Sequence, residues 1–501
     1  MIQFLNGKIG EIVDYENDEE WSAEKIIKEV DKRITYLLEK NVLPEEKIII
    51  IHGNNIQFFA DLLALWSLNA CVVCVDPTVG AREFKTIARF CDSRIALYNG
   101  KVSKKLSSLV GSLIEFVDLK EIAKEYNRGS KIPLNKIDLD RPALILFTSG
   151  TTGNPKGVVH SLRTLIAKWE ILKKHVPLGY LEISLCLLPT HFGHGLICNC
   201  LYPLLNGKKL IILPRFNLKS IMELGRIIDR YKVTYMSSVP AVWKSVSNLS
   251  DCPRGKTLQL VTCGSAPLGA RLWRDIQRWT STYRVWNTYG ITEVGSWVGG
   301  LQQDIVRPVS GLIGCGWGAD FMITKEGADS IEEIVAEKSL PVGREGHIWI
   351  NTAAVMLGYY KREDLTCSVM RGKWFYTGDI GYVRKDGLLV LTGRVRNEIN
   401  FAGLKISPED IDLVIEEHEA VKESCVFGMN DKITGEIVAV AVVFKDYINK
   451  PTIHEMKNWV SNYVSDYKVP RIWYELRNIP KTSRGKYNRK KVAKYCKELG
   501  N

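Results

Sequence analysis

The sequence predicts an α/β protein whose large N-terminal domain holds mainly parallel sheets flanked by helices, with a small α+β domain at the C-terminus. Three observations indicate this architecture. Short runs rich in Val, Ile and Leu alternate with amphipathic stretches over residues 45–240, which is typical of parallel strands covered by helices. After residue 300 glycines become frequent and the β segments shorter, which indicates partly antiparallel strands. A chain of 501 residues is also too long for one compact core.

The alternating part of the chain defines the individual elements. Strands are expected where an apolar run is short, and helices where an amphipathic stretch follows it. The expected strands cover residues 46–53, 70–76, 143–147, 208–216 and 233–240. The expected helices cover residues 55–70, 160–175 and 218–231. Further along, "RKDG" at 384–387 is expected to form the turn of a β-hairpin.

A different pattern begins after Arg396. Ser407 and Pro408 are expected to open a helix over residues 408–418, because proline is well tolerated in the first turn. Strands at 423–429 and 436–445 and a helix at 453–464 follow. These elements make a unit of ordinary domain size. We therefore divide the chain into an N-terminal domain, residues 1–395, and a C-terminal domain, residues 396–501.

The composition argues against several classes of protein. With 46% hydrophobic and 25% charged residues, the chain resembles an ordinary globular protein. No apolar run approaches the ~20 residues of a membrane helix, and the first residues lack the pattern of a signal peptide. The 12 cysteines form no CxxC pair and mostly lie in apolar contexts. We expect reduced thiols, a cytoplasmic protein and no membrane partner.

The net charge of +12 raises the question of an anionic partner. Near the C-terminus, "KTSRGKYNRKK" spans residues 481–491, and Glu475 is the only acidic residue between 468 and 497. Such a stretch could contact CoA phosphates or an acidic carrier protein, or simply form a solvated helix face. It lacks the interleaved aromatic residues of a recognisable nucleic-acid module, so we expect no nucleic-acid partner.

Residues 147–157, "FTSGTTGNPKG", follow a predicted buried strand and are rich in hydrogen-bond donors. Glycines let backbone N–H groups approach an anion closely, and hydroxyls and a lysine add further donors. The order of residues differs from the P-loop of NTPases, in which Gly-Lys-Ser/Thr opens a helix. The segment therefore predicts a phosphate site and argues against a motor protein or GTPase.

This loop resembles the phosphate loop of the adenylate-forming (AMP-binding) superfamily, which includes acyl-CoA synthetases, aryl- and acyl-acid carrier-protein ligases and adenylation domains. Six further segments resemble motifs of that family and follow in the same order. They are "LPTHFGHG" (188–195), "CGSAPLG" (263–269), "NTYGITE" (287–293), "VMLGYYKRED" (355–364), "YTGDIG" (376–381) and "GRVRNEINFAG" (393–403). A seventh segment, "PKTSRGKYNR" (480–489), resembles the last motif of the family. The resemblance implies a small distorted β-barrel within the N-terminal domain and a mobile C-terminal domain.

The resemblance implies that a carboxylate attacks the α-phosphate of ATP, that pyrophosphate leaves and that an acyl adenylate forms. The implied ATP site comprises Thr148, Ser149, Gly150, Thr151, Thr152, Gly153, Lys156, Gly264, Ser265, Ala266, Asn287, Thr288, Tyr289, Gly290, Asp379 and Arg394. The residues of the loop would hold the β- and γ-phosphates. Tyr289 would stack on the adenine, and Asp379 with Arg394 would bind the ribose.

The catalytic residues implied by the resemblance are Lys486, His191, Thr292 and Glu293. Glu293 would bind Mg²⁺, an ion that prefers oxygen ligands. Thr292 would meet the α-phosphate, and His191 would lie near the substrate carboxylate. Lys486 would reach both groups. His194 matches no catalytic position and is not assigned a role.

Two further residues relate to the movement of the C-terminal domain. Arg396 stands at the family's hinge, where Asp or Lys is usual. Gly403 would leave room for a pantetheine arm, because glycine lets a chain pass closely. Asn400 stands where many relatives carry lysine, and we read it as a trait of a subgroup.

The expected acid pocket is apolar. Its predicted lining is Phe192, Gly193, Leu196, Val261, Cys263 and Trp297. Phe192 stands where amino-acid-activating relatives place an aspartate, so the ammonium of an α-amino acid would be buried without a partner. The sequence therefore disfavours an α-amino acid, and an inward Trp297 would favour a small, medium or aromatic acid.

The acyl acceptor is expected to be a pantetheine thiol, on CoA or on an acyl or peptidyl carrier protein. The resemblance thus implies an acid–thiol ligase that uses ATP and Mg²⁺. Two alternatives remain at this point: a stand-alone adenylating enzyme that passes the acyl group to an amine, and a nucleotide-binding protein without catalysis.

Overall fold

We analysed a computed structural model of the chain. It describes residues 8–99, 113–118, 136–148, 156–214, 218–265, 268–304, 307–309, 311–325, 327, 339–394, 399–406, 408–416, 418–446, 448–480 and 489–499. Eight predicted site residues lie outside these ranges: Ser149, Gly150, Thr151, Thr152, Gly153, Ala266, Arg396 and Lys486. Of Arg394 only the backbone is described.

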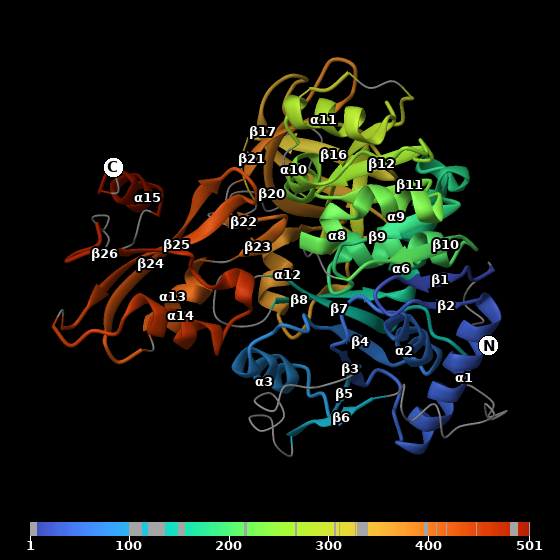
Figure 1. Ribbon diagram of the computed structural model, residues 1–501, viewed down its shortest axis with the longest axis horizontal. Helices are drawn as coiled ribbons and strands as arrows, with labels where there is room; N and C mark the ends of the chain where they lie inside the picture. Colours follow the sequence, from blue (N-terminus) through green and yellow to red (C-terminus); the bar gives the residue numbers. More distant parts are fainter. Residues whose placement is uncertain are drawn as a thin grey trace.

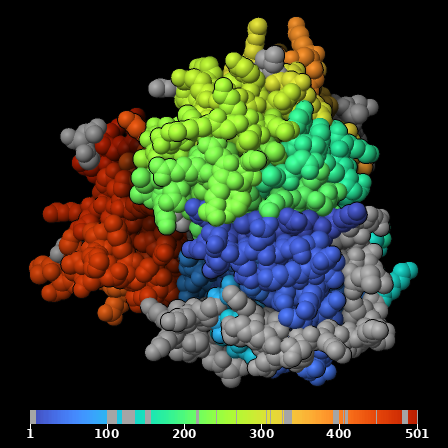
Figure 2. Space-filling model, turned by 45° about the vertical axis from the view of Figure 1, so that its right-hand side comes forward, coloured from blue at the N-terminus to red at the C-terminus, as the bar shows by residue number. Residues whose placement is uncertain are grey.

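The predicted division into a large N-terminal and a small C-terminal part is visible in Figure 1, where the orange-red C-terminal elements form a lobe beside the rest of the chain. Figure 2 shows this lobe in contact with both blue and green surfaces. The two parts have separate hydrophobic cores, because the buried residues of the lobe cluster among themselves. The exact domain boundary stays a prediction.

A first sheet of seven strands contains the two strands that flank the glycine-rich segment, β7 and β8. Its order is β18-β8-β7-β4-β3-β5-β6. The parallel strands are β7 (Pro142–Thr148), β4 (Cys71–Cys74), β3 (Lys47–Ile50), β5 (Ile95–Leu97) and β6 (Glu115–Val117). β8 (Lys156–Ser161) and β18 (Gly358–Tyr359) are added antiparallel. The apolar runs predicted as buried strands are confirmed here, and β7 ends where the glycine-rich segment begins.

A second, larger sheet begins parallel and continues antiparallel. Its parallel strands are β1 (Ile12–Asp14), β10 (Lys209–Ile212), β9 (Ile183–Cys186), β11 (Tyr235–Ser238), β12 (Leu260–Gly264) and β13 (Val285–Ile291), with β2 (Glu19–Trp21) antiparallel at one edge. The antiparallel strands are β14 (Ser296–Gly300), β15 (Leu312–Gly316), β21 (Leu389–Arg394), β20 (Trp374–Val383), β17 (Gly346–Thr352) and β16 (Ala319–Thr324), with β19 (Met370–Arg371) on β20. The expected change of pattern after residue 300 is thus confirmed, as is the hairpin turn between β20 and β21.

The helix α2 (Ile56–Ser67) explains how the two sheets share one core. Every residue of α2 is buried. Its neighbours in the largest hydrophobic cluster come from both sheets, for example Ile48 and Leu144 from the first and Leu185 and Leu210 from the second. Helix α3 (Ala81–Phe90) covers the other face of the first sheet with Phe84 and Ile87.

Other helices flank the sheets. They are α1 (Ala23–Glu39), α6 (Leu162–His175), α7 (Tyr202–Leu204), α10 (Pro240–Leu249), α11 (Ala270–Thr280) and α12 (Glu363–Val369). The prediction of a single helix over residues 218–231 is wrong, because the segment is helical but is interrupted at Glu223. It forms α8 (Leu218–Met222) and α9 (Leu224–Tyr231). A π-helix (His194–Leu201) follows the segment that carries His191.

The C-terminal lobe is a sheet with helices on both faces. Its strands are β22 (Ile399–Phe401), β23 (Leu404–Ile406), β24 (Val421–Asp431), β25 (Gly435–Phe444) and β26 (Ile472–Glu475). Its helices are α13 (Pro408–Glu416), α14 (Ile453–Ser461) and α15 (Arg489–Leu499). The predicted α+β composition is confirmed. Residues of α13 and α14 pack on one face of the sheet, and Val492 and Cys496 of α15 on the other.

A buried polar network holds α1 against α2. Arg33 Nε lies 2.5 Å from Asp61 Oδ1, and His52 Nε2 lies 2.5 Å from Asp61 Oδ2. Arg33 Nη1 also lies 2.8 Å from Glu29 Oε2. The Arg33 and Asp61 side chains have no exposed surface, so each charge depends on its partners.

We predict that Arg33→Met lowers the free energy of unfolding of the N-terminal domain by about 3 kcal/mol, because it leaves the Asp61 carboxylate buried without its guanidinium. Denaturant unfolding followed by tryptophan fluorescence measures this loss. The control Lys173→Met removes an exposed ion pair with Glu170, so its effect should stay below about 1 kcal/mol. Equal losses in the two variants would contradict the importance of the buried network.

Candidate active site

The predicted motifs meet where strands of the two sheets end. β7 ends at Thr148, and β8 returns from the glycine-rich segment with Lys156 as its first residue. In the second sheet β13 ends at Ile291, and a short 3₁₀-helix (Thr292–Val294) follows directly. Carboxyl ends of parallel strands are where α/β sheets commonly bind ligands.

Lys156 and Glu293 form the contact that joins these two places. Lys156 Nζ lies 3.3 Å from Glu293 Oε1, although the residues are 137 positions apart in the chain. The hydroxyl of Tyr359 donates to the same carboxylate oxygen at 2.8 Å. Lys156 Nζ also lies 4.1 Å from the centroid of the Tyr359 ring, which is within the range of a cation–π contact. One cation and one hydroxyl therefore converge on a single carboxylate.

The environment keeps Glu293 ionised. Burial alone would raise the pKa of its carboxyl, but the Lys156 ammonium and the Tyr359 hydroxyl outweigh burial, and the net shift of the pKa is downward. An ionised carboxylate beside a lysine is a suitable ligand for a hard divalent cation that also binds phosphate. Tyr359 lies in the segment 355–364, from which the sequence analysis assigned no site residue, so its part in this cluster was missed.

Two buried basic residues support the turn that carries Thr292 and Glu293. The carbonyl of Thr292 accepts a hydrogen bond from His160 Nε2 at 2.8 Å, and burial lowers the pKa of His160 to about 4, so the ring is neutral. The carbonyl of Trp297 accepts from Lys168 Nζ at 2.5 Å, and burial lowers the pKa of Lys168 to about 8. The turn is thus held at both ends.

These two supporting residues were also missed from the sequence. His160 lies in β8, whereas Thr164 and Lys168, four residues apart, lie on one buried face of the amphipathic helix α6. His160 Nδ1 lies 3.2 Å from Thr164 Oγ1. The available signal was a pair of polar residues on the helix face that also carries Leu165 and Leu172, since buried polar groups need partners.

The predicted ribose-binding residues lie side by side. Asp379 on β20 and Arg394 on β21 are directly paired across the two strands. Asp379 is 4% exposed, and its Oδ2 accepts a hydrogen bond from the Tyr289 hydroxyl at 2.6 Å. Tyr289 therefore links the segment predicted to wall the adenine to the one predicted to bind ribose.

The remaining residues of the predicted adenine wall are tightly packed. Gly264 and Thr288 are opposite each other on β12 and β13. A Cβ atom at Gly264 would lie 2.4 Å from Thr288 Oγ1, so only glycine fits. Thr288 Oγ1 donates to the carbonyl of Cys263, and Asn287 Nδ2 to the carbonyl of Leu312. Gly290 has a similarly close neighbour in the carbonyl of Ser296. The side chains of Thr288 and Asn287 are thus bonded within the protein.

His191 lies beside a carboxylate from the first sheet. Its Nε2 is 3.4 Å from Asp76 Oδ2. Asp76 Oδ1 accepts from both the N–H and the hydroxyl of Thr78 at 2.8 Å. Asn54 supports the same region, because its side chain bonds the carbonyl of Leu188 and the N–H of Thr190. His191 is thus held by loops of both sheets.

His194, to which the sequence assigned no role, is buried and contacts Trp297, one of the residues of the predicted pocket lining. Its Nε2 lies 2.6 Å from Ser237 Oγ and its Nδ1 lies 2.9 Å from Ser265 Oγ. Burial lowers the pKa of His194 to about 3, so the ring is neutral. The Trp297 ring meets it edge-on at 5.2 Å, so Trp297 lies against His194 in the buried interior. The position of His194 within "LPTHFGHG", next to the predicted pocket residues, was the sequence signal that could have indicated its place.

The predicted pocket lining is otherwise apolar and buried. Leu196, Val261 and Cys263 have no exposed surface, Trp297 is 2% exposed, Gly193 is buried, and Phe192 is half-buried. His194 and its hydroxyl partners are the polar exception. Thr262 Oγ1 donates to Ser237 Oγ at 2.6 Å, which continues the hydrogen-bonded chain beneath the pocket.

The C-terminal lobe reaches this region through the turn between β22 and β23. Gly403 has a left-handed backbone with φ of +87°. A Cβ atom there would lie 3.1 Å from Val239 Cγ1, at the start of α10. Gly403 therefore lies against the N-terminal domain, just beyond the carboxyl end of β11.

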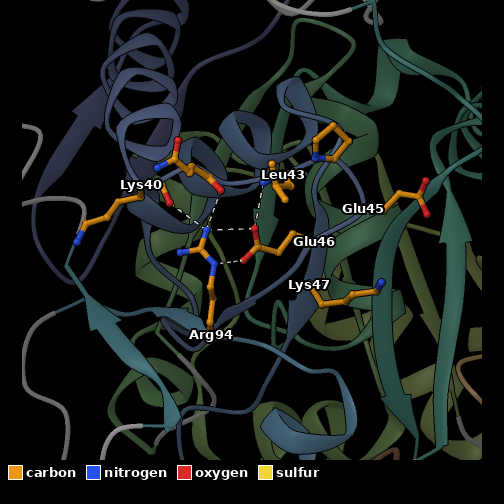
Figure 3. A pocket seen from close by; sticks show the side chains of 8 residues that line it. Lys40, Leu43, Glu45, Glu46, Lys47 and Arg94 are labelled. Carbon is orange, nitrogen blue, oxygen red and sulfur yellow. Dashed lines mark hydrogen bonds and ion pairs between the residues drawn. The ribbon is translucent and has the colours of Figure 1, made fainter.

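A surface depression elsewhere does not belong to this site. Figure 3 shows it between the end of α1 and the start of β3, with Lys40, Lys47, Glu46 and Arg94 around it. It lies at the amino ends of the parallel strands, opposite to the edge where β7 ends. Arg94 already bonds the carbonyls of Lys40 and Asn41 and the Glu46 carboxylate. The guanidinium of Arg94 is therefore already bonded to groups of the protein itself.

The residues that the structure describes contain no group of three or more His, Cys, Asp or Glu side chains arranged to hold a metal ion. Within the same ranges, no helix combines the length and the apolar composition needed to span a membrane.

Comparison with known families places the chain. The model of the AMP-binding enzyme family matches residues 10–360, and that of the AMP-binding enzyme C-terminal domain matches residues 410–486. A 4-coumarate–CoA ligase-like protein of Arabidopsis thaliana (ligase-like 6) is 27% identical over 89% of this chain and 81% of its own. The chain belongs to the AMP-binding enzyme family.

Solved structures with similar folds were also found. The amide bond synthetase McbA of Marinactinospora thermotolerans has a TM-score of 0.84 at 22% identity and covers 99% of this chain and 98% of its own. The o-succinylbenzoate CoA synthetase of Bacillus subtilis bound with a product analogue has a TM-score of 0.85 at 20% identity, over 98% and 97% of the two chains. The same enzyme with its acyl-adenylate intermediate scores 0.66 at 20% identity, over 98% and 96%.

These findings confirm the resemblance seen in the motifs. The protein is an ATP-dependent acid–thiol ligase that works through an acyl-adenylate intermediate. The predicted α/β architecture with its small C-terminal domain is confirmed with it. The roles of individual residues remain predictions.

We predict that Tyr359→Phe raises the pKa of Glu293, because the hydroxyl helps to lower it. A carboxyl with a depressed pKa loses its charge as pH falls, so the acid limb of the adenylation rate should move to higher pH. The loss of a hydrogen bond to a charged group, about 1.5–3 kcal/mol, should lower kcat/KM roughly ten- to a hundredfold.

The neighbouring Tyr360→Phe is the matched control, since Tyr360 packs against Phe90 and has no described bond to Glu293. Its pH profile should coincide with that of the wild type. An unchanged acid limb in Tyr359→Phe would contradict the assigned cluster.

Proposed function

We propose that this enzyme activates a small, medium or aromatic carboxylic acid, other than an α-amino acid, and transfers the acyl group to the thiol of CoA. The observation that carries the proposal is the convergence of Lys156 and Tyr359 on Glu293, which brings the phosphate segment of one sheet to the catalytic turn of the other. The likeness to the plant CoA ligase-like protein supports CoA as acceptor.

In the first half-reaction, a carboxylate oxygen of the acid attacks the α-phosphorus of ATP, and the bond from that phosphorus to the pyrophosphate oxygen breaks. Thr148 and Lys156 bind the β- and γ-phosphates, and Thr292 meets the α-phosphate. Two anions must approach each other, so fixed cations and N–H groups account for most of the stabilisation. Lys486, on the C-terminal domain, bridges the α-phosphate and the acid.

Mg²⁺ fits the residues present. Glu293 provides one ionised oxygen ligand, and Mg²⁺ commonly takes only one or two protein carboxylates together with substrate phosphates. When bound, the ion neutralises developing charge on the phosphates. Asp379, with its buried carboxylate held by Tyr289, accepts hydrogen bonds from the ribose hydroxyls.

In the second half-reaction, the thiol sulfur attacks the acyl carbonyl carbon, AMP leaves, and the thiol proton passes to solvent. The arrangement of the two domains supports this assignment, since it resembles a synthetase with a product analogue more than the same synthetase with an acyl adenylate. Gly403, close against Val239, suits the passage of a thin pantetheine arm.

The lining of the pocket supports the choice of acid. Trp297 lies against His194 in the buried interior and fills space that a long chain would need. The Asp76 carboxylate does not replace the aspartate of amino-acid-activating relatives, because Thr78 and His191 already engage it. His194 adds a neutral polar group whose two nitrogens are bonded to hydroxyls.

A carrier protein is the alternative source of the thiol, and α15 supports it with exposed Lys490, Lys491, Lys494 and Lys497. An amine is the alternative acceptor, consistent with the amide bond synthetase of the same fold. We also propose a cytoplasmic location, supported by 12 free cysteines of which nine are buried.

The function is tested by ATP–pyrophosphate exchange across a broad panel of carboxylic acids. We expect exchange above background with at least one small or aromatic acid, and mass analysis should then find its CoA thioester. If no acid supports exchange, the protein binds nucleotide without catalysis. An amide or carrier-bound product in place of the CoA thioester would overturn the proposed acceptor alone.

We predict that Lys486→Ala slows adenylate formation by orders of magnitude, because losing one charge contact to the transition state typically costs ~3–4 kcal/mol. Transfer from preformed acyl adenylate to the thiol should be largely spared. Rapid-quench assays of each half-reaction measure the difference. The neighbouring Lys490→Ala is the control and should leave both rates unchanged, whereas equal loss of both rates in Lys486→Ala would contradict its assignment.

A further inference from the structure

We infer that the beginning of α3 is the seat on which the C-terminal domain docks for thioester formation, with Gly80, Arg82 and Glu83 as positioning residues for that step. This inference rests on the proposed function, since it concerns the second half-reaction of the same site. Helix α3 lies beside the C-terminal lobe in Figure 1, and the contacts between them come from residues 80–83 and 463–468.

Gly80 makes the closest approach between the two domains. A Cβ atom at Gly80 would lie 2.8 Å from the carbonyl carbon of Tyr463 and 2.9 Å from the backbone nitrogen of Val464. A clash with such a Cβ atom could not be relieved by rotating a side chain, because the opposing atoms belong to the backbone. The backbone of Gly80 has φ of −66° and ψ of 144°, which any residue adopts readily. Glycine is therefore required here by the docked domain and not by the fold of α3.

Arg82 and Glu83 add specific contacts on either side. The Arg82 guanidinium carbon lies 3.9 Å from the centroid of the Tyr463 ring, which favours a cation–π contact. Tyr463 is 7% exposed and packs in the core of the C-terminal domain, so its ring is a fixed platform. Glu83 Oε1 accepts from Lys468 Nζ at 2.7 Å, and Glu83 Oε2 from Ser465 Oγ at 3.5 Å.

The seat also determines where the turn at Gly403 lies. Ala402 in that turn packs against the main core of the N-terminal domain, and Gly403 lies against Val239. Among the described residues, the C-terminal domain thus contacts the N-terminal domain both at α3 and at the edge of the predicted acyl site. A rigid domain held at the seat therefore keeps the turn at the edge of that site.

Of the two half-reactions, thioester formation is the one that should depend on the seat. A variant that cannot dock should still form acyl adenylate, because that reaction uses a different placement of the C-terminal domain in the proposed mechanism. It should be slow to form the thioester. A general loss of stability would instead lower both rates, so the ratio of the two rates separates positioning from folding.

Gly80→Ala is the sharpest test. We expect its ATP–pyrophosphate exchange to stay within about twofold of the wild type, while the single-turnover rate from preformed acyl adenylate to CoA thioester falls at least about tenfold, as for an overpacked contact. Gly179→Ala is the control, because Gly179 has open space around its Cα and both rates should be unchanged. A wild-type rate of thioester formation in Gly80→Ala would overturn the inference, as would equal loss in both half-reactions.

The ion pair is tested by reversing it. Glu83→Lys and Lys468→Glu should each slow thioester formation, and the double variant should recover much of the lost rate, because opposite charges again face each other. A double variant no faster than the slower single variant would overturn the role of this pair in docking.

Small-angle X-ray scattering tests docking without any substrate. We expect Gly80→Ala and Glu83→Lys to have a larger radius of gyration than the wild type and Gly179→Ala, since the lobe is released from its seat. If no acid supports exchange but scattering changes as expected, the proposed function fails and the docking seat stands. Unchanged scattering in both variants would overturn the seat whatever the outcome of the exchange assay.

Discussion

The contact between Lys156 and Glu293 is the interaction on which the rest of the site depends. Each residue belongs to a different sheet, and their meeting requires that both sheets share one core across the fully buried helix α2. The carboxylate stays ionised despite burial because the ammonium and the Tyr359 hydroxyl converge on it. His160 and Lys168 then hold the turn that bears Glu293 from behind. A cation, a carboxylate and a braced backbone turn are thus held in one place, and fixed groups of this kind favour electrostatic stabilisation of phosphoryl transfer.

Much of the fold could be predicted because its signals are local. Apolar runs such as residues 143–147 and amphipathic stretches such as 160–175 correspond to β7 and α6. The motifs could likewise be found in order, since each is a short contiguous segment. The prediction of one helix over 218–231 was wrong because amphipathic periodicity alone does not reveal an interruption such as that at Glu223.

Features that depend on contacts between distant segments could not be predicted in the same way. His194 lies among apolar residues, yet both of its ring nitrogens have hydrogen-bond partners. These partners are Ser237 and Ser265, which are 43 and 71 positions away in the chain. The requirement for glycine at position 80 comes from backbone of residues 463–464 in another domain. The place of Trp297 in the buried interior also depends on its neighbours, His194 and Trp317. The basic stretch near the C-terminus contains one lysine with a proposed catalytic role and a helix, α15, that packs on the sheet through Val492 and Cys496.

We propose that this enzyme forms an acyl adenylate where the two sheets meet and then converts it to a thioester with the C-terminal domain docked on α3. Rapid-quench analysis with ATP labelled at the α-phosphate, an acid that supports exchange, and CoA tests this sequence of events most directly. We expect enzyme-bound acyl adenylate to appear first and to decay at the rate at which thioester and AMP form. Thioester that forms without a preceding acyl adenylate, or with release of ADP instead of AMP, would contradict this order of reactions.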